Sequence, residues 1–474
     1  MNNYALLAPE IFLVLATAVV RLVDVFFLSN RRVLNLHLSL VALLGTFVFL
    51  WQQSGTEGSL FNGAFVVDQL ATTLKLWIVL IVAGVLAYST AYLRDRDILK
   101  GEYYDLATTG LLGMMIMVSS GSMLVAYLGL EMLSLSLYAM VAFNRDSARC
   151  SEAAIKYFVL GAIASGMLLY GVSMIYGISG ELKFDAIAAS LESDKKDNVA
   201  LLLGLACVVV GLAFKLGAVP FHMWVPDVYD GAPTVVTLYI SSAPKIAGFA
   251  LAIRFLADGL QVLQADWQGM LVILAVLSLA VGNVIAIAQT NIKRMLAYST
   301  ISHVGFLMLG LLAGTSEGYA SAMFYAITYA VTSLGGFGVL LLMSRRGFEA
   351  DQLDDLKGLF RRSPWFALTM MVLLLSMAGV PPTVGFYAKL SVLKSVVAID
   401  LVWLALYAVV FSIIGAYYYL RAIKVIFFDQ PEEIHNLDDG LALRAILSVN
   451  GLAVLGLGIF PGALMAACIA AFGG

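Results

Sequence analysis

The feature that most constrains this chain is a succession of long apolar stretches that runs from one end of the sequence to the other. A helix needs about 20 apolar residues to cross the ~30 Å hydrocarbon core of a membrane, and about fourteen stretches approach or exceed that length. The sequence therefore predicts an all-α polytopic membrane protein. The predicted spans lie near 4–27, 33–51, 68–92, 104–119, 122–143, 152–178, 199–219, 233–257, 267–289, 294–314, 318–343, 365–397, 401–427 and 440–470.

Composition excludes several other classes of protein. Hydrophobic residues make up 61% of the 474 positions and charged residues 12%, whereas soluble domains have roughly 45–50% and 25%. The net charge of −3 comes without a long basic run, so no nucleic-acid partner is expected. The three cysteines, Cys150, Cys207 and Cys468, are far apart and outside any histidine cluster. No metal site and no redox centre are predicted.

Basic residues predict the orientation of the spans, because cytoplasmic loops accumulate lysine and arginine. The stretch 345–362 carries Arg345, Arg346, Lys357, Arg361 and Arg362, and Lys293 and Arg294 are also assigned to an inner loop. The loops assigned to the outside keep Lys183, Lys195, Lys196 and Arg254. This bias predicts an even number of spans with both termini in the periplasm.

Six lysines fall inside apolar stretches, namely Lys75, Lys156, Lys215, Lys245, Lys389 and Lys394. A lysine at the bilayer centre costs at least ~2.5–3.5 kcal/mol, but near a span end it can extend its ammonium to the headgroups. We expect this for Lys394 and Lys75. Lys156 lies four residues after Glu152, so an interfacial ion pair and a functional role both stay open.

The other three buried lysines each lie beside a helix breaker. Lys215 precedes Pro220, Lys245 follows Pro244, and Lys389 follows Pro381 and Pro382. Proline removes a backbone hydrogen bond, which a membrane tolerates only where the freed carbonyl meets protein or water. The stretch 365–397 would also make about 50 Å of helix, too long for one span, so it must be interrupted or bent. The pattern predicts broken helices beside hydrated cavities.

One acidic residue and two histidines complete the candidate site. Glu131 lies near the middle of the fifth span, and Ser134 and Tyr138 share its helical face. The carboxylate of Glu131 either takes part in proton transfer or forms a static ion pair between two helices. His222 and His303 could relay protons between lysines, because histidine titrates near neutral pH, or could only hydrogen-bond a carbonyl.

Several long motifs resemble the antiporter-like subunits of proton-pumping NADH:quinone oxidoreductase, respiratory complex I. They are YLGLEMLSLSLYAM, EAAIKYFVLGAIASG, FKLGAVPFHMWVPDVYDGAPT, SSAPKIAGFA, IAQTNIKRMLAYSTISHVGF and AGVPPTVGFYAKL. The opening LLAPEIFLVL is similar to bacterial subunit N, and the lysine of GFYAK argues against subunit M, which is expected to carry a glutamate there. The resemblance covers nearly the whole chain.

The resemblance implies a pair of inverted five-helix repeats, each with a broken helix, in a single membrane domain of residues 1–474. Their ranges would be 104–257 and 267–427, after an N-terminal three-helix segment, 1–103, and before a C-terminal helix, 440–474. The residues that match proton-transfer positions of the family are Glu131, Lys215, Lys245, Lys389, Lys156, His222 and His303.

The resemblance also implies a mechanism and a location. Glu131 would stabilise protonated Lys215, and loosening this pair would send the proton through Lys245 toward Lys389. Quinone reduction in other subunits would drive the movement, so NADH, flavin, iron–sulfur clusters and quinone would belong to membrane and peripheral partners, and this chain would hold no cofactor. The location would be a bacterial inner membrane. A subunit of a multisubunit cation/proton antiporter is the alternative; a purely structural subunit would not need three proline-flanked lysines.

Overall fold

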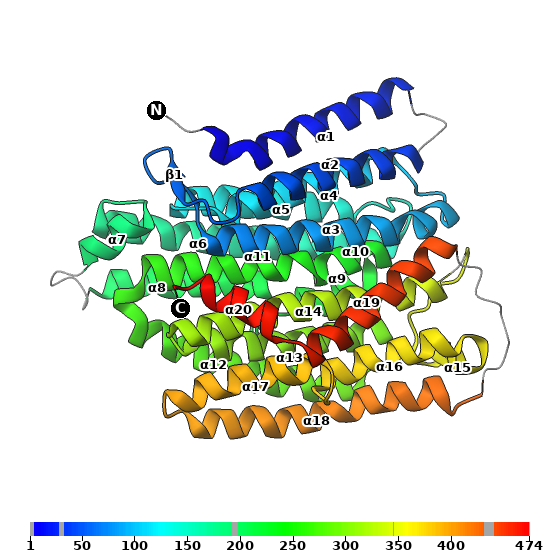
Figure 1. Cartoon of the computed structure of the whole chain (residues 1–474). Coiled ribbons are helices and arrows are strands. Elements are labelled where there is room, and N and C mark those ends of the chain that lie inside the picture. Colours follow the sequence, from blue (N-terminus) through cyan, green and yellow to red (C-terminus); the bar gives the residue numbers. More distant parts are fainter. Residues whose placement is uncertain (1–3, 28–32, 192–197, 345, 431–439, 474) are drawn as a thin grey trace.

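The structure is a computed structural model that describes residues 4–27, 33–191, 198–344, 346–430 and 440–473. Nearly parallel helices of very different sequence position lie side by side in one bundle (Figure 1). Lys195, Lys196 and Arg345, which contributed to the predicted orientation, lie outside the described residues.

Helices dominate the described part of the chain. They are α1 Ala8–Phe27, α2 Val33–Gln52, α3 Gln69–Asp95, α4 Gly101–Val118, α5 Met123–Val141, α6 Ala148–Ser179, α7 Phe184–Leu191, α8 Val199–Leu216, α9 Trp224–Gly231, α10 Thr234–Ser241, α11 Ala243–Ala252, α12 Gln264–Ala288, α13 Ile292–Leu312, α14 Ser316–Met343, α15 Leu359–Arg362, α16 Pro364–Ala378, α17 Val384–Ala398, α18 Val402–Phe427, α19 Leu441–Ile459 and α20 Gly462–Ala470. A π-helix, Ile253–Gly259, extends α11, and single 3₁₀ turns lie at Tyr4–Leu7, Gln261–Leu263 and Leu353–Leu356.

The predicted class of fold is confirmed. Within the described residues, 12 helical segments are long and apolar enough to cross a membrane. The helix α4 and the interrupted pair α16 and α17 occupy two further predicted spans. The last predicted span, 440–470, is the exception, because Pro461 separates α19 from α20 where one helix was expected. Proline has no N–H to continue the helical hydrogen bonds.

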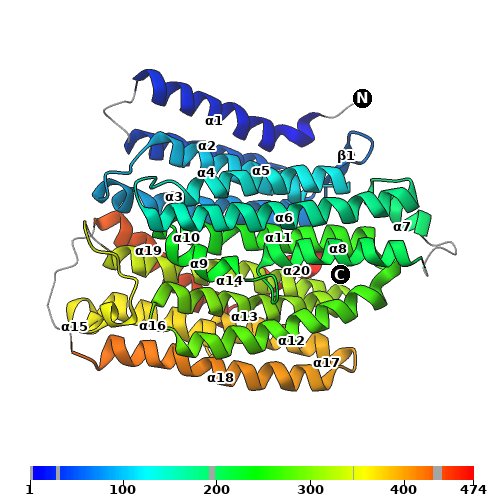
Figure 2. The ribbon, with the colours of Figure 1, turned by 180° about the vertical axis from the view of Figure 1, so that it is seen from behind.

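A small hairpin and a short helix lie at one end of the bundle. Strands β1 (Gly58–Leu60) and β2 (Phe65–Val67) pair antiparallel, with Gly58 opposite Val67. This hairpin, α7 and the N-terminus lie at one end of the helices, and α15 lies at the other end in both views (Figures 1 and 2). The two ends therefore present different loops to the two sides of a membrane.

Glycines bring α4 and α5 into direct backbone contact. A Cβ built on Gly113 of α4 would lie 2.7 Å from the backbone nitrogen of Leu133, and one on Gly129 of α5 would lie 2.7 Å from that of Met117. Small residues permit such an approach between membrane helices, where packing stabilises association. The helix that carries Glu131 is thus fixed against its neighbour by positions that tolerate no side chain.

Two spans break in the same way. The helix α8 ends at Leu216 and α16 ends at Ala378, and each is followed by a glycine in the left-handed region, Gly217 at φ +85° and Gly379 at φ +87°. Glycine adopts this conformation without a steric penalty and commonly ends helices.

The residue after each glycine then donates its N–H back to a helix carbonyl. Ala218 donates to Ala213 at 2.8 Å, and Val380 donates to Leu375 at 2.9 Å. The prolines of each break follow within a few residues, and a new helix, α9 or α17, begins beyond them. The predicted interruption of 365–397 is confirmed.

Candidate functional site

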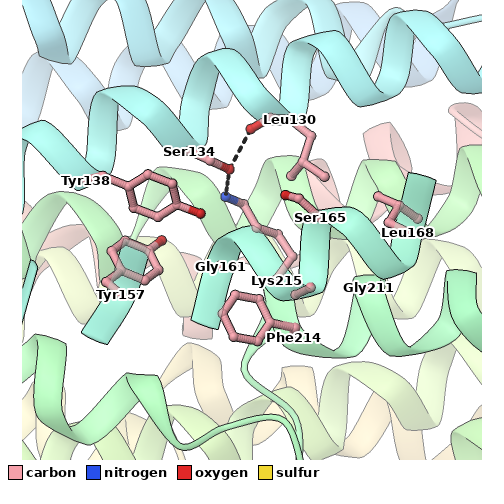
Figure 3. Close-up of a pocket in the computed structure, with 11 residues that line it drawn as sticks. Leu130, Ser134, Tyr138, Tyr157, Gly161, Ser165, Leu168, Gly211, Phe214 and Lys215 are labelled. Carbon is pink, nitrogen blue, oxygen red and sulfur yellow. Dashed lines mark hydrogen bonds between the residues drawn. The ribbon is translucent and has the colours of Figure 1, made fainter. Parts of the chain in front are cut away.

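Lys215 lies at the end of α8 and reaches toward α5. Its Nζ donates a hydrogen bond of 2.9 Å to Oγ of Ser134, and Ser134 in turn donates to the carbonyl of Leu130 (Figure 3). Tyr138 and Tyr157 lie on the other side of the same small cavity (Figure 3). The cavity volume of about 10 Å³ is close to what one water molecule requires.

Glu131 lies one helical turn before Ser134 and is half-buried. Among the described residues no ion pair joins it to Lys215, and its Oε1 is buried without a hydrogen-bond partner. Glu131 on α5 and Lys215 on α8 therefore form no ion pair, and Ser134 is the residue to which Lys215 donates. The described residues thus show no static ion pair of Glu131 between two helices, which was the alternative role for this residue.

Lys245 lies in α11, directly after the interruption that separates α10 from α11 at Ser242. Its side chain is 3% exposed, and its Nζ donates to the carbonyl of Leu216 at 2.8 Å and lies over the ring of Trp224. Leu216 is the last residue of α8, where the helix dipole favours a cation. Because Leu216 follows Lys215, the two lysines meet the same helix end.

Lys389 repeats this arrangement in the second broken span. Its Nζ donates to the carbonyl of Ala378, the last residue of α16, at 2.9 Å. A second hydrogen bond of 2.9 Å joins it to Oγ of Ser412, and the ring of Phe306 lies 4.9 Å away. Lys394, which lies on α17 together with Lys389, is exposed. The expected contrast between an inward Lys389 and an outward Lys394 is confirmed.

His303 lies at the centre of a tyrosine cluster. Its Nδ1 is 2.6 Å from the hydroxyl of Tyr325, and its Nε2 is 3.2 Å from the hydroxyl of Tyr419. A cavity of about 20 Å³, enough for one water, is bounded by His303 on α13 and by Ser376 and Ala388 on either side of the α16–α17 break. The histidine thus hydrogen-bonds titratable side chains instead of a carbonyl and faces the helix that carries Lys389.

His222 and Lys156 lie toward the edge of the site. His222 is 8% exposed in the α8–α9 break, and its Nδ1 is buried without a partner. Lys156 pairs with Glu152 at 2.8 Å, as the i,i+4 spacing predicts, and with Asp227 at 2.9 Å. Its side chain is 44% exposed, so the structure does not bring it to the buried lysines.

Lys75 does not extend to the headgroups, so that prediction is wrong. Its side chain is 2% exposed and forms an ion pair with Glu10 of α1 at 2.5 Å. The ring of Phe65, in the hairpin, lies 4.9 Å from its Nζ. A buried charge needs a partner, and Glu10, an acidic residue at the start of an apolar stretch, was the available signal in the sequence.

In the residues that the structure describes, no group of three or more His, Cys, Asp or Glu side chains could hold a metal ion. The three cysteines are free and buried.

Comparison with known proteins agrees with this architecture. The family described as NADH:quinone oxidoreductase/Mrp antiporter, TM, matches residues 120–415. A chain of respiratory complex I from Thermus thermophilus is similar, with a TM-score of 0.84 and 29% identity over 97% of this chain and 98% of that one. A chain of an archaeal membrane-bound sulfane sulfur reductase gives a TM-score of 0.86 over 99% and 97% of the two chains, but at 23% identity this likeness concerns the fold alone.

Interrupted helices with buried lysines at their ends define an antiporter-like membrane protein. The chain is 60% identical to NADH-quinone oxidoreductase subunit N of Thioalkalivibrio sulfidiphilus (strain HL-EbGR7) over 96% of both chains. It is 55% identical to subunit N of Thiobacillus denitrificans (strain ATCC 25259 / T1) over 100% of this chain and 98% of that one. The chain belongs to the NADH-quinone oxidoreductase subunit N family.

Proposed function

We propose that this chain is the proton-translocating membrane subunit of a bacterial NADH-quinone oxidoreductase. Protons move along Glu131, Lys215, Lys245 and Lys389, and NADH, flavin, iron–sulfur clusters and quinone are handled by partner subunits. The observation that carries the proposal is the pair of lysines, Lys245 and Lys389, that donate to the terminal carbonyls of two interrupted helices.

The first half of the path is proposed to work through charge repulsion. Lys215 and Lys245 meet at the end of α8, so a proton on one disfavours a proton on the other. When Glu131 approaches Lys215, it stabilises the ammonium; when it withdraws, Lys215 keeps only the neutral Ser134 as a partner. A proton then passes toward Lys245.

The second half uses His303 and Lys389. The small cavity beside His303 can hold one water, and this water would link His303 to the α16–α17 break. His222 and Lys156 are assigned to the edge of the path, where Lys156 can exchange protons with the aqueous side through Asp227.

We propose the domain organisation that the motifs imply. Residues 104–257 and 267–427 form two inverted repeats, preceded by a three-helix segment, 1–103, and followed by a C-terminal segment, 440–474. The matching breaks after Leu216 and Ala378, both ended by a left-handed glycine, support this division.

Both termini are proposed to lie in the periplasm. Arg346, Lys357, Arg361 and Arg362 belong to the loop region around α15, at the end of the bundle opposite the hairpin and the N-terminus (Figure 1). Basic loops face the cytoplasm in most membrane proteins, which supports a cytoplasmic position of the α15 end.

Purification of the tagged chain tests the assembly, and substitution tests the path. Co-purifying flavin and iron–sulfur subunits support the proposal, whereas their absence would favour a cation/proton antiporter subunit. Lys215→Ala and Glu131→Ala should lower the protons moved per NADH oxidised in liposomes without loss of assembly. Lys215→Arg should not restore pumping, because a guanidinium does not release its proton. A variant that assembles and pumps normally removes its residue from the path.

A further inference from the structure

Lys293, which the sequence places in an inner loop, is instead a fourth buried lysine at a helix end. It lies in the first turn of α13 and is 1% exposed. Its Nζ donates to the carbonyl of Ala232 at 2.9 Å, and Ala232 is the residue directly after α9. Lys245 and Lys389 likewise donate to carbonyls at helix ends, those of the last residues of α8 and α16.

Within the described residues, the Nζ of Lys293 has one hydrogen bond and no carboxylate at ion-pair distance. An ammonium has three N–H donors, and the carbonyl of Ala232 takes one of them. A buried charge is costly unless it is paired or hydrogen-bonded throughout. Lys75, which is buried for structural reasons, has a carboxylate in direct contact. Lys293 therefore resembles the lysines of the proposed path and not the structural one.

Glu349 supplies a negative charge close to this lysine. It lies in the loop after α14, where the hydroxyl of Tyr92 donates to both its oxygens at 3.0 Å and Nη2 of Arg96 lies 2.5 Å away. Thr234 also donates its hydroxyl to Glu349, two residues after the carbonyl that holds Lys293. The carboxylate and the ammonium thus flank the same turn, between α9 and α10.

Glu349 is ionised in this setting. Burial raises the pKa of its carboxyl, but the charges of Lys293 and Arg96 and the hydrogen bonds from Thr234 and Tyr92 outweigh burial, so that its pKa lies below the ordinary value. The charge of Glu349 in turn acts on Lys293, as do the charges of Arg149, Asp230 and Asp351. Glu131 and Lys215 are likewise a glutamate and a lysine that lie on neighbouring elements without direct contact.

Polar groups continue from Lys293 into the bundle. Thr300 lies seven residues further along α13, almost two turns, and so shares the face of Lys293. The hydroxyl of Tyr329 donates to Oγ1 of Thr300 at 2.7 Å, and the Tyr329 ring centroid is 4.9 Å from that of His303. The hydroxyl of Tyr229, on α9, is also buried, without a hydrogen-bond partner among the described residues.

We infer that Lys293, whose ammonium is stabilised by the charge of Glu349, is a proton-loading residue on the α15 side of the membrane. Its protons reach His303 and Lys389 without passing through Lys215 or Lys245. A proton from water binds the neutral amine of Lys293 and leaves it as Lys293 returns to the neutral form, so no other reactant is needed. This route rests on the proposed function and adds an entry that bypasses Lys215 and Lys245.

The test measures protons moved per NADH oxidised by the assembled complex in liposomes. Lys293→Gln should lower this number, and Lys293→Arg should lower it too, because arginine keeps the carbonyl contact but does not release a proton. Glu349→Gln should also lower it, and Glu349→Asp should recover part of the loss. Asp354→Asn is the matched control, since Asp354 lies five residues after Glu349, is 73% exposed, pairs with Lys357 at 3.0 Å and should leave pumping unchanged.

The possible results separate the inference from the function on which it rests. Normal pumping by Lys293→Arg would assign Lys293 a structural role and overturn the inference, and this variant decides the question if Lys293→Gln does not assemble. A loss in Asp354→Asn equal to that in Glu349→Gln would show that any carboxylate of this region has the same effect, which also overturns it. Lys389→Ala is measured in parallel because Lys389 lies on both routes, and normal pumping there would overturn the proposed function instead.

Discussion

Ser134 stands between Lys215 and the helical turn that carries Glu131: the Nζ of Lys215 lies 2.9 Å from the serine Oγ, while a Glu131 oxygen is buried without a partner. A neutral hydroxyl thus holds the lysine in this conformation. To exchange the serine for the carboxylate, Nζ must move its contact along α5 by about one helical turn. This exchange gives the proposed path a switch with two identifiable contacts.

Ser134→Ala should therefore impair pumping. A hydrogen bond to a charged group is worth about 1.5–3 kcal/mol, roughly tenfold or more in an equilibrium, and Ser134 is the hydrogen-bond partner of Lys215 in this structure. Proton pumping per NADH and its pH dependence should both change. Ser136→Ala is the control, because Ser136 is also buried on α5 but donates only to the carbonyl of Met132. Equal effects of the two substitutions would contradict a specific role of Ser134.

Glu10→Gln should destabilise the subunit without acting on the proton path. Removing one partner of a buried ion pair leaves the other charge uncompensated and costs about 3–5 kcal/mol, and Lys75 is 2% exposed beside Glu10. The expected result is a lower thermal unfolding temperature of the purified complex or a lower yield. Replacing both residues, Glu10→Leu with Lys75→Met, should recover much of the loss. Glu57→Gln, at an exposed position, should be nearly silent.

The orientation can be checked with reporter fusions. A fusion after Lys357, beside α15, should report the cytoplasm, and one after Lys183, beside α7, should report the periplasm. These two regions lie at opposite ends of the bundle (Figure 2). Reversed reports at both sites would invert the proposed topology, and identical reports would contradict an odd number of spans between them.

Local chemistry explains which parts of the fold could be predicted from the sequence. Apolar length predicts the spans, and Pro381 and Pro382 predict the interruption between α16 and α17 because their effect on a helix does not depend on tertiary contacts. The partners of buried charges depend on packing. Glu10 and Lys75 are 65 positions apart in the sequence, so the position of Glu10 signals an acid in an apolar stretch but not the residue that it meets.

Lys293 illustrates the same limit for the candidate site. Its neighbours Asn291 and Arg294 indicate a loop or a helix end at the membrane surface, and α13 does begin at Ile292. Whether a lysine in a first turn is exposed depends on what packs over it, and here Lys293 is 1% exposed and contacts the turn after α9. The tyrosines around His303 come from α14 and α18 and could be placed beside it only by the fold.

The two lysines of α17 provide the sharpest internal comparison. Five residues along a helix rotate a side chain by about 140°, and accordingly Lys389 reaches the end of α16 and Ser412 while Lys394 is exposed. Lys389→Ala should lower coupled proton transport, measured as protons moved per NADH in liposomes, because it removes the group held at the α16–α17 break. Lys394→Gln should be nearly silent. Equal losses in both variants would mean that charge on α17, rather than the position beside the break, is what matters, and normal pumping by Lys389→Ala would remove Lys389 from the path.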